Sequence, residues 1–132
     1  MSTKVRPFLM FAGNAAEAMR FYVSLFEDGN IIDEERYGPS EAGAEGSVKK
    51  ASFCIGGQLV ACIDSAVKHD FTFTPAISFF IDCESADDIE RKFAALSEGG
   101  TVFMPLAEYD FSRRFGWAQD RFGVSWQLNL PW

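Results

Sequence analysis

The chain has 132 residues, of which 48% are hydrophobic and 15% aromatic, and its formal net charge is −7. This length is typical of one compact domain, and the apolar fraction is sufficient for a core, which excludes a disordered chain. The negative charge and the scattered basic residues argue against nucleic-acid binding. The chain has no apolar run near the roughly 18 residues of a membrane span and no signal-peptide pattern, so we expect a cytoplasmic protein without a membrane partner.

The first half of the chain predicts the order strand, helix, strand, strand, strand. A helix is expected after Asn14, which with Glu17 forms a capping pattern, and Gly29 is expected to end it. Gly56 and Gly57 are typical of a tight hairpin turn, and the polar segment 38–47 is typical of a flexible loop. The expected strands are 5–12, 30–37, 48–55 and 58–64.

The second half repeats this order. Ser85 and Asp88 are expected to cap a helix that Gly99 and Gly100 end, and its buried side is Ala86, Ile89, Phe93 and Leu96. The expected strands are 72–82, 101–104, 115–119 and 124–130.

Matching landmarks in the two halves indicate a duplicated unit. Asn14 and Ser85 are 71 positions apart, and Gly57 and Gly123 are 66 positions apart. The chain is therefore predicted to be one α+β domain, residues 1–132, built from two β-α-β-β-β modules at about 1–66 and 67–132 that pair around a cavity.

Three segments carry a family resemblance: PFLMFAGNAAEAMRFYVSLF, FTFTPAISFFIDC and FGWAQDRFGVSWQLNL. They resemble the PhnB-like proteins, also labelled 3-demethylubiquinone-9 3-methyltransferase-like, within the vicinal oxygen chelate superfamily. The resemblance implies the glyoxalase/bleomycin resistance/dioxygenase fold, a homodimer and a small-molecule ligand. Methyl transfer is not expected, because the chain lacks the Gly-rich strand-to-helix loop that a nucleotide-type methyl donor needs.

The resemblance also implies where a metal would bind. Metal-dependent members of the superfamily use His, Glu or Gln on the first and last strands of each module. Carried over, these positions fall near Pro7 and Ala76, which cannot ligate through their side chains, on Gln127, and at one of Ala61, Cys62 or Asp64. We therefore expect neither a cofactor nor a divalent metal, because transition metals need imidazole or thiolate and calcium needs several carboxylates. A metal-dependent lyase, isomerase or dioxygenase remains an alternative.

The segment 105–117 offers a candidate ligand clamp. Arg113 and Arg114, together with Tyr109 and Phe111, suit a planar anionic ligand, because guanidinium groups pair with carboxylate or phosphate and stack on rings. The alternative is a surface loop whose aromatic side chains cover the edge of the core.

Polar residues on the last expected strand are a second candidate. Gln127 shares one side of that strand with Ser125 and Asn129, so the three form either the polar floor of a cavity or a set that satisfies buried neighbours, while Trp126 and Leu128 face the helix. The ligand-cavity candidates are Phe11, Phe53, Asp64, Phe80, Tyr109, Arg113, Arg114, Trp117 and Gln127.

Nucleophilic and acid–base groups are few. Cys54, Cys62 and Cys83 lie in apolar segments without C-x-x-C spacing and are interpreted as buried thiols; a nucleophile would need the single histidine, His69, beside it. Asp64, His69, Asp70 and Asp82 are the remaining polar groups near strand ends; they are interpreted as solvated loop charges, and a general base among them is the alternative.

The chain is thus predicted to bind a small molecule in an aromatic-rich, metal-poor cavity, and no catalytic residue is assigned. An enzyme of unassigned reaction, a resistance-type protein that sequesters a planar or anionic compound, and an interaction scaffold with a filled cavity remain open.

Overall fold

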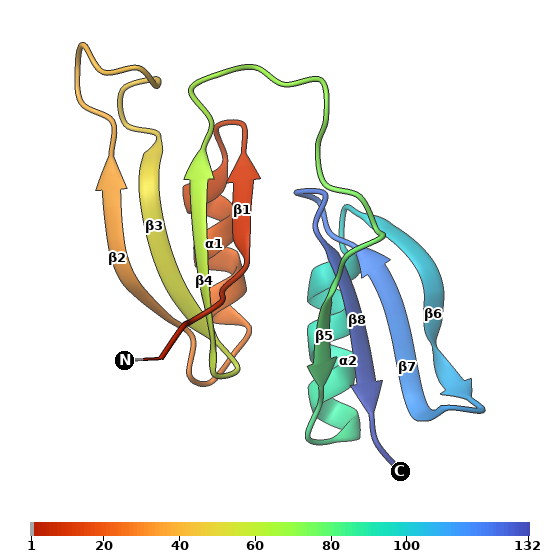
Figure 1. Ribbon diagram of the computed structural model, residues 1–132. Helices are drawn as coiled ribbons and strands as arrows, with labels where there is room; N and C mark the ends of the chain where they lie inside the picture. Colours follow the sequence, from red (N-terminus) through yellow and green to blue (C-terminus); the bar gives the residue numbers. More distant parts are fainter. Residues whose placement is uncertain (1) are drawn as a thin grey trace. The chain divides into compact units, whose positions relative to one another are not determined.

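The computed structural model describes residues 2–132. The chain divides into two compact units, one ending at His69 and the other spanning Asp70–Trp132, and each has the element order β-α-β-β-β (Figure 1). The α+β class and the repeated module are therefore confirmed. The pairing of the modules around a cavity stays a prediction.

The first unit is one sheet with strand order β1-β4-β3-β2 and helix α1 (Ala15–Ser24) on one face. β1 runs parallel to β4, and the other neighbours are antiparallel. Gly56 and Gly57 have φ values of 53° and 81°, which confirms the expected hairpin turn, since these values favour glycine. The strands are β1 (Phe8–Phe11), β2 (Asn30–Arg36), β3 (Val48–Ile55) and β4 (Gln58–Asp64).

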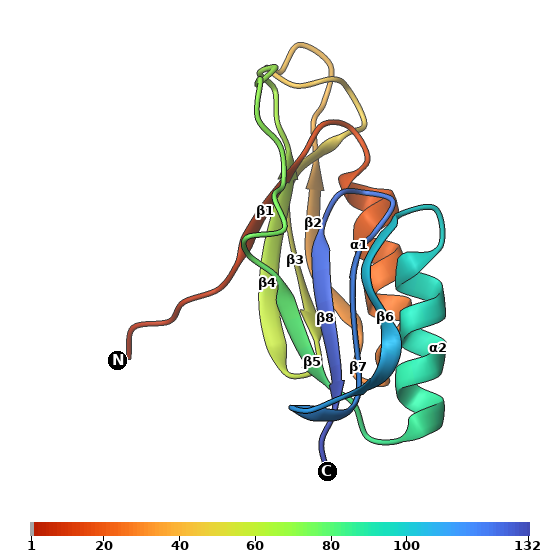
Figure 2. The ribbon, with the colours of Figure 1, turned by 90° about the vertical axis from the view of Figure 1, so that its right-hand side faces the viewer.

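The second unit repeats this topology with the order β5-β8-β7-β6 and helix α2 (Ala86–Ser97), which lies along one face of its sheet (Figure 2). β5 is parallel to β8, and the remaining neighbours are antiparallel. The strands are β5 (Phe79–Asp82), β6 (Thr101–Tyr109), β7 (Ser112–Gln119) and β8 (Ser125–Leu130).

Some expected boundaries were wrong. β1 and β5 are each only four residues long, and residues 72–78 precede β5 without joining the sheet. Residues 105–114, expected to be a loop, belong instead to a hairpin in which β6 extends to Tyr109 and β7 begins at Ser112. Pro105 is tolerated there because β6 is an edge strand with register shifts on both sides of this residue.

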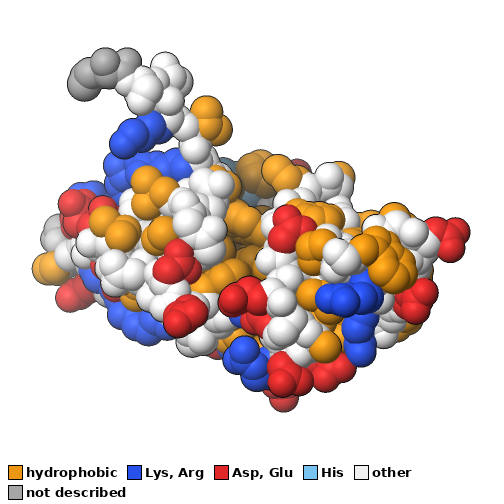
Figure 3. Space-filling model, turned by 90° about the horizontal axis from the view of Figure 1, so that it is seen from below, with side chains coloured by type: hydrophobic (Ala, Val, Ile, Leu, Met, Phe, Trp, Pro, Cys, Tyr) orange, Lys and Arg blue, Asp and Glu red, His pale blue; other side chains and the backbone are white. Residues whose placement is uncertain are grey.

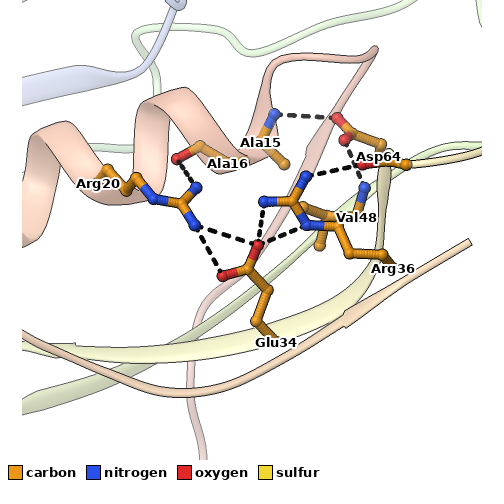
Figure 4. A network of polar contacts seen from close by, with 8 residues as sticks. Ala15, Ala16, Arg20, Glu34, Arg36, Val48 and Asp64 are labelled. Carbon is orange, nitrogen blue, oxygen red and sulfur yellow. Dashed lines mark hydrogen bonds and ion pairs between the residues drawn. The ribbon is translucent and has the colours of Figure 1, made fainter.

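The start of α1 is capped from a distant strand. Asn14 occupies the N-cap position, as predicted, but its side chain makes no capping hydrogen bond. Instead, Oδ1 of the buried Asp64 at the end of β4 accepts hydrogen bonds from the backbone N–H groups of Gly13 (2.7 Å) and Ala15 (3.0 Å). Its Oδ2 accepts from Val48 at 2.9 Å, so one carboxylate joins β4, β3 and the helix start (Figure 4).

The end of α1 also differs from expectation. The helix ends at Ser24, five residues before Gly29. Gly29 is nevertheless required, because a Cβ atom there would lie 1.8 Å from the carbonyl oxygen of Val23.

The cap of α2 is as predicted. The backbone N–H of Asp88 donates to Ser85 Oγ at 3.1 Å, and Asp88 Oδ2 accepts from the N–H of Glu84. Asp88 also forms an ion pair with Lys92, and both side chains are buried. Burial opposes ionisation of Asp88, but the hydrogen bonds from Lys92 and Glu84 outweigh it and lower the pKa of this carboxyl. Ile89, Phe93 and Leu96 are buried as expected, whereas Ala86 is exposed.

Candidate functional site

A pocket of about 510 Å³ lies in the second unit and is lined by Phe80, Met104, Phe111, Phe115, Trp117, Gln127 and Asn129. It lies on the face of the sheet opposite α2. The position of Gly116 shows this, because a Cβ atom there would meet the α2 residue Phe93 at 2.4 Å, and its strand neighbours Phe115 and Trp117 point the other way.

The wall of this pocket is aromatic. The ring of Phe115 lies edge-on to Phe111 at 5.0 Å between centroids and is 6.2 Å from Phe80. Tyr109 stacks on Phe111 at 5.6 Å and donates its hydroxyl hydrogen to the backbone oxygen of Pro105. These contacts hold the rings in fixed orientations, which suits an apolar, ring-containing ligand.

A chain of hydrogen bonds runs beneath the rings. Trp117 Nε1 donates to Ser125 Oγ at 2.9 Å, and Ser125 Oγ lies 2.6 Å from Ser78 Oγ. Gln127 Nε2 donates to the same Ser78 oxygen at 3.3 Å. Ser78 was not among the predicted site residues. The available signal was its place two positions before Phe80, which puts the two side chains on the same side.

The other side-chain amide of the pocket, that of Asn129, is hydrogen-bonded through both its nitrogen and its oxygen. Asn129 Nδ2 donates to Asp82 Oδ1 at 2.9 Å, and its Oδ1 accepts a hydrogen bond from Ser112 Oγ. Asp82 is exposed, and its carboxylate holds the amide in place from the neighbouring strand β5. Gln127 and Asn129 thus share the pocket side, as expected, while Trp126 and Leu128 are fully buried on the α2 side.

The structure brings only some of the predicted ligand-cavity residues to the pocket. Phe80, Trp117 and Gln127 line the pocket, and Tyr109 supports it through Phe111. Phe53 lies in the first unit and faces α1, with its ring 6.3 Å from Tyr22.

Two further candidates also lie in the first unit. Phe11 is buried and paired with Asp64 in the sheet register, and both oxygens of Asp64 accept backbone hydrogen bonds. These contacts describe a structural role for Asp64.

The two arginines of the expected clamp point to opposite sides of β7. Arg114 forms an ion pair with Glu90 of α2 at 2.9 Å, so it lies on the helix side. Strand alternation puts the exposed Arg113 on the pocket side, with Phe115. The two guanidinium groups therefore cannot close on one ligand, which corrects the clamp hypothesis.

The thiols have the expected environment in two of three cases. Cys62 and Cys83 are buried and unpaired, and burial raises the pKa of each thiol to about 12. Cys54 is half-buried. His69 is exposed, and its Nε2 lies 3.0 Å from Ser65 Oγ in the first unit.

Of the positions that the family resemblance implies for a metal, Gln127 lines the pocket, whereas both carboxylate oxygens of Asp64 accept backbone hydrogen bonds. Because Asp64 caps α1, strand alternation turns Cys62 and Asp64 toward that helix and leaves Ala61 and Ile63 on the other face. In the first sheet Ile63 of β4 is paired with Met10 of β1, and in the second sheet Gln127 of β8 is paired with Phe80 of β5. Ile63 is therefore the counterpart of Gln127 in the first unit. Within residues 2–132 the structure brings together no group of three or more His, Cys, Asp or Glu side chains that suits a metal.

A comparison with known proteins places this geometry in a family. Residues 3–129 match the family described as 3-demethylubiquinone-9 3-methyltransferase. The PhnB protein from Bacillus cereus is 48% identical, with 97% of this chain and 99% of that chain covered and a TM-score of 0.95. Protein YjdN from Escherichia coli is 22% identical over 94% of this chain and 92% of its own length.

A more distant structure shows the wider fold. The fosfomycin resistance protein FosX from Listeria monocytogenes is 15% identical with a TM-score of 0.66, covering 100% of this chain and 95% of that chain. Methyl transfer is not supported, because the turns after β1 (Ala12, Gly13, Asn14) and β5 (Cys83, Glu84, Ser85) are not Gly-rich nucleotide-binding loops. The chain belongs to the 3-demethylubiquinone-9 3-methyltransferase family and has the vicinal oxygen chelate fold.

Proposed function

We propose that the protein binds a small, uncharged aromatic compound in the pocket on the β5–β8 sheet. The observation that carries this proposal is the lining itself, in which four aromatic rings and one methionine surround two amides. A volume of about 510 Å³ lies in the range of small-molecule sites, and a mainly apolar wall with a few fixed polar groups is typical of them.

The charge of the lining favours an uncharged ligand over the anion expected earlier. None of the residues that line the pocket carries a formal charge. Arg114 is paired with Glu90 on the other side of the strand, and the exposed Arg113 is not among the residues that line the pocket.

We further propose that binding requires no metal, since the polar groups at the pocket are neutral amides and hydroxyl groups, and the indole N–H of Trp117 has no lone pair for a metal. A metal at the pocket would act as a Lewis acid toward a ligand oxygen, and these groups are too weak to hold one. Elemental analysis tests this point, as set out below.

Thermal unfolding with a library of neutral, anionic and cationic aromatic compounds tests the proposed function. A compound that binds only the folded state raises the melting temperature by mass action. We expect neutral bicyclic compounds to give the largest increases and Phe115→Ala to abolish them. Val102→Ala, on β6 outside the lining, is the matched control and should retain them. An increase for anionic compounds alone would contradict the proposal.

We also propose a homodimer in the cytoplasm. Large hydrophobic side chains outside the pocket are exposed, among them Phe8, Ile32, Val67 and Ile77, which favours burial against a second copy. The cysteines are unpaired, as is usual in a reducing compartment. Sedimentation that shows only a species of 14.7 kDa at micromolar concentration would contradict the dimer.

Two surface features bear on other partners. In residues 2–132 no helix is long and apolar enough to cross a membrane. On the face shown in Figure 3, acidic, basic and hydrophobic side chains are interspersed, which supports a proposed absence of nucleic-acid binding.

A further inference from the structure

The hydrogen-bond chain beneath the aromatic rings begins at one obligate donor, the indole N–H of Trp117. An indole nitrogen only donates, so Ser125 Oγ must accept from Trp117 Nε1 at 2.9 Å. Ser125 then has its own hydroxyl hydrogen to give, and its hydroxyl partner is Ser78 Oγ at 2.6 Å. Either hydroxyl of the Ser125–Ser78 pair can be the donor, and we assign the hydrogen to Ser125, whose oxygen already accepts from Trp117, so that the chain runs from Trp117 through Ser125 to Ser78.

Ser78 receives a second hydrogen bond from the opposite side. Gln127 Nε2 donates to Ser78 Oγ at 3.3 Å, so both lone pairs of this oxygen are used. The hydroxyl hydrogen of Ser78 remains to donate. Ser78 is half-buried and shares the pocket side of its segment with Phe80, which lines the pocket.

The other polar groups of the pocket are also directed by their partners. Asn129 gives one amide hydrogen to Asp82 and accepts from Ser112, so its second N–H is the group left over. Two hydrogen-bond donors, the Ser78 hydroxyl and the second N–H of Asn129, thus remain at the polar end of an otherwise aromatic pocket. A ligand that matches them presents an oxygen with lone pairs.

We propose that Ser78 is a specificity-determining residue of the pocket, whose hydroxyl donates to an oxygen acceptor, such as a ketone carbonyl, on an aromatic ligand. This inference rests on the proposed function, since it concerns the same pocket. It names the ligand class as aromatic carbonyl compounds and assigns their selection to a residue outside the apolar lining. A ligand without an oxygen acceptor would leave the Ser78 hydroxyl desolvated and without a hydrogen-bond partner. This cost makes the pocket favour carbonyl compounds.

Two probes of equal shape test the assignment. 2-Acetylnaphthalene carries a carbonyl oxygen, and 2-isopropenylnaphthalene carries a CH₂ group in its place. Titration followed by ¹H–¹⁵N spectra gives a Kd for each probe, and the indole signal of Trp117 and the amide signals of Gln127 report the location. We expect the wild type to prefer the carbonyl probe by about tenfold.

Substitution of Ser78 separates the inference from the proposed function. Ser78→Ala should bring the two affinities to within about twofold by weakening only the carbonyl probe, and Ser78→Thr should restore the preference. Ser97→Ala on α2 is the control and should behave as the wild type. A preference that survives Ser78→Ala, or equal binding of both probes to the wild type, overturns the role of Ser78 alone. Binding of neither probe overturns the proposed function as well.

The direction of the chain has its own test. Trp117→Phe removes the indole donor and frees a lone pair of Ser125, which favours a hydrogen bond from Ser78 to Ser125 over one from Ser78 to the ligand. We expect the ratio of the two affinities to fall, although both probes lose contacts with the indole ring. A full tenfold ratio in this variant would contradict the direction and the assignment of Ser78 with it.

Discussion

Arg114 of β7 and Glu90 of α2 form an ion pair at 2.9 Å on the side of the sheet opposite the pocket. The neighbouring Arg113 lies on the pocket side and is exposed. Two adjacent arginines in one sequence motif therefore have unrelated surroundings, because successive side chains of a strand point to opposite faces.

The first prediction separates these two arginines. Arg114→Ala should lower the free energy of unfolding by up to about 1 kcal/mol, the scale of a partly exposed ion pair, without changing the affinity for 2-acetylnaphthalene. Arg113→Ala should leave stability unchanged, and it serves as the matched control. Urea denaturation and NMR titration measure the two effects. A loss of ligand affinity in Arg114→Ala but not in Arg113→Ala would contradict the assignment of sides.

The second prediction concerns the start of α1. Asp64→Asn replaces one accepting oxygen with an NH₂ group that cannot accept, so at least one buried N–H loses its partner and stability should fall by about 3 kcal/mol. Asn14→Ala should cost less than about 0.5 kcal/mol, because Asn14 makes no side-chain capping bond. Urea denaturation compares the two variants, and a larger loss in Asn14→Ala would refute the Asp64 cap.

The third prediction concerns thiol reactivity. Since the pKa values of Cys62 and Cys83 are raised to about 12, both groups stay protonated and unreactive at pH 8. Iodoacetamide should therefore modify only the half-buried Cys54 in the native protein, and all three thiols in urea. Mass spectrometry of peptides identifies the sites, and rapid native modification of Cys62 would show that its strand is accessible.

The same two thiols predict a pH dependence of stability. In the unfolded chain a thiol loses its proton near pH 8.5, whereas in the folded protein it keeps the proton up to about pH 12. Above the unfolded pKa the folded state binds more protons, so stability should fall as the pH rises from about 9 to 12. The double variant Cys62→Ala, Cys83→Ala, although less stable at pH 7, should show a smaller decline over this range in urea denaturation.

The fifth prediction concerns metal content. Elemental analysis after dialysis should find well under one equivalent of zinc, nickel, manganese or iron per chain, and EDTA should leave the binding of 2-acetylnaphthalene unchanged. The physical reason is that Pro7 and Ala76 have no ligating side chain, Asp64 accepts backbone hydrogen bonds, and Gln127 offers only a neutral amide. Near-stoichiometric metal that is lost in Gln127→Ala would restore a metal-dependent reaction as the leading function.

Much of the fold follows from local sequence. The bounds of β3 and β4, the Ser85–Asp88 cap and the glycine turn at Gly56 and Gly57 were predicted correctly. Each depends on residues within a few positions of one another. Apolar alternation, capping side chains and positive φ act over such short distances, so a single sequence contains the information needed.

The site depended on tertiary structure for two physical reasons. Side-chain direction follows from the pairing register, which a sequence does not show, so Phe53 and Asp64 could not be assigned to the α1 face in advance. Hydrogen bonds between distant segments are equally hidden. Ser78 and Ser125 are 47 positions apart, and Asp64 and Ala15 are 49 apart, yet each pair is in direct contact. The sequence alone determined which modules form, and only the packing of strands and helix determined which polar groups meet at the pocket.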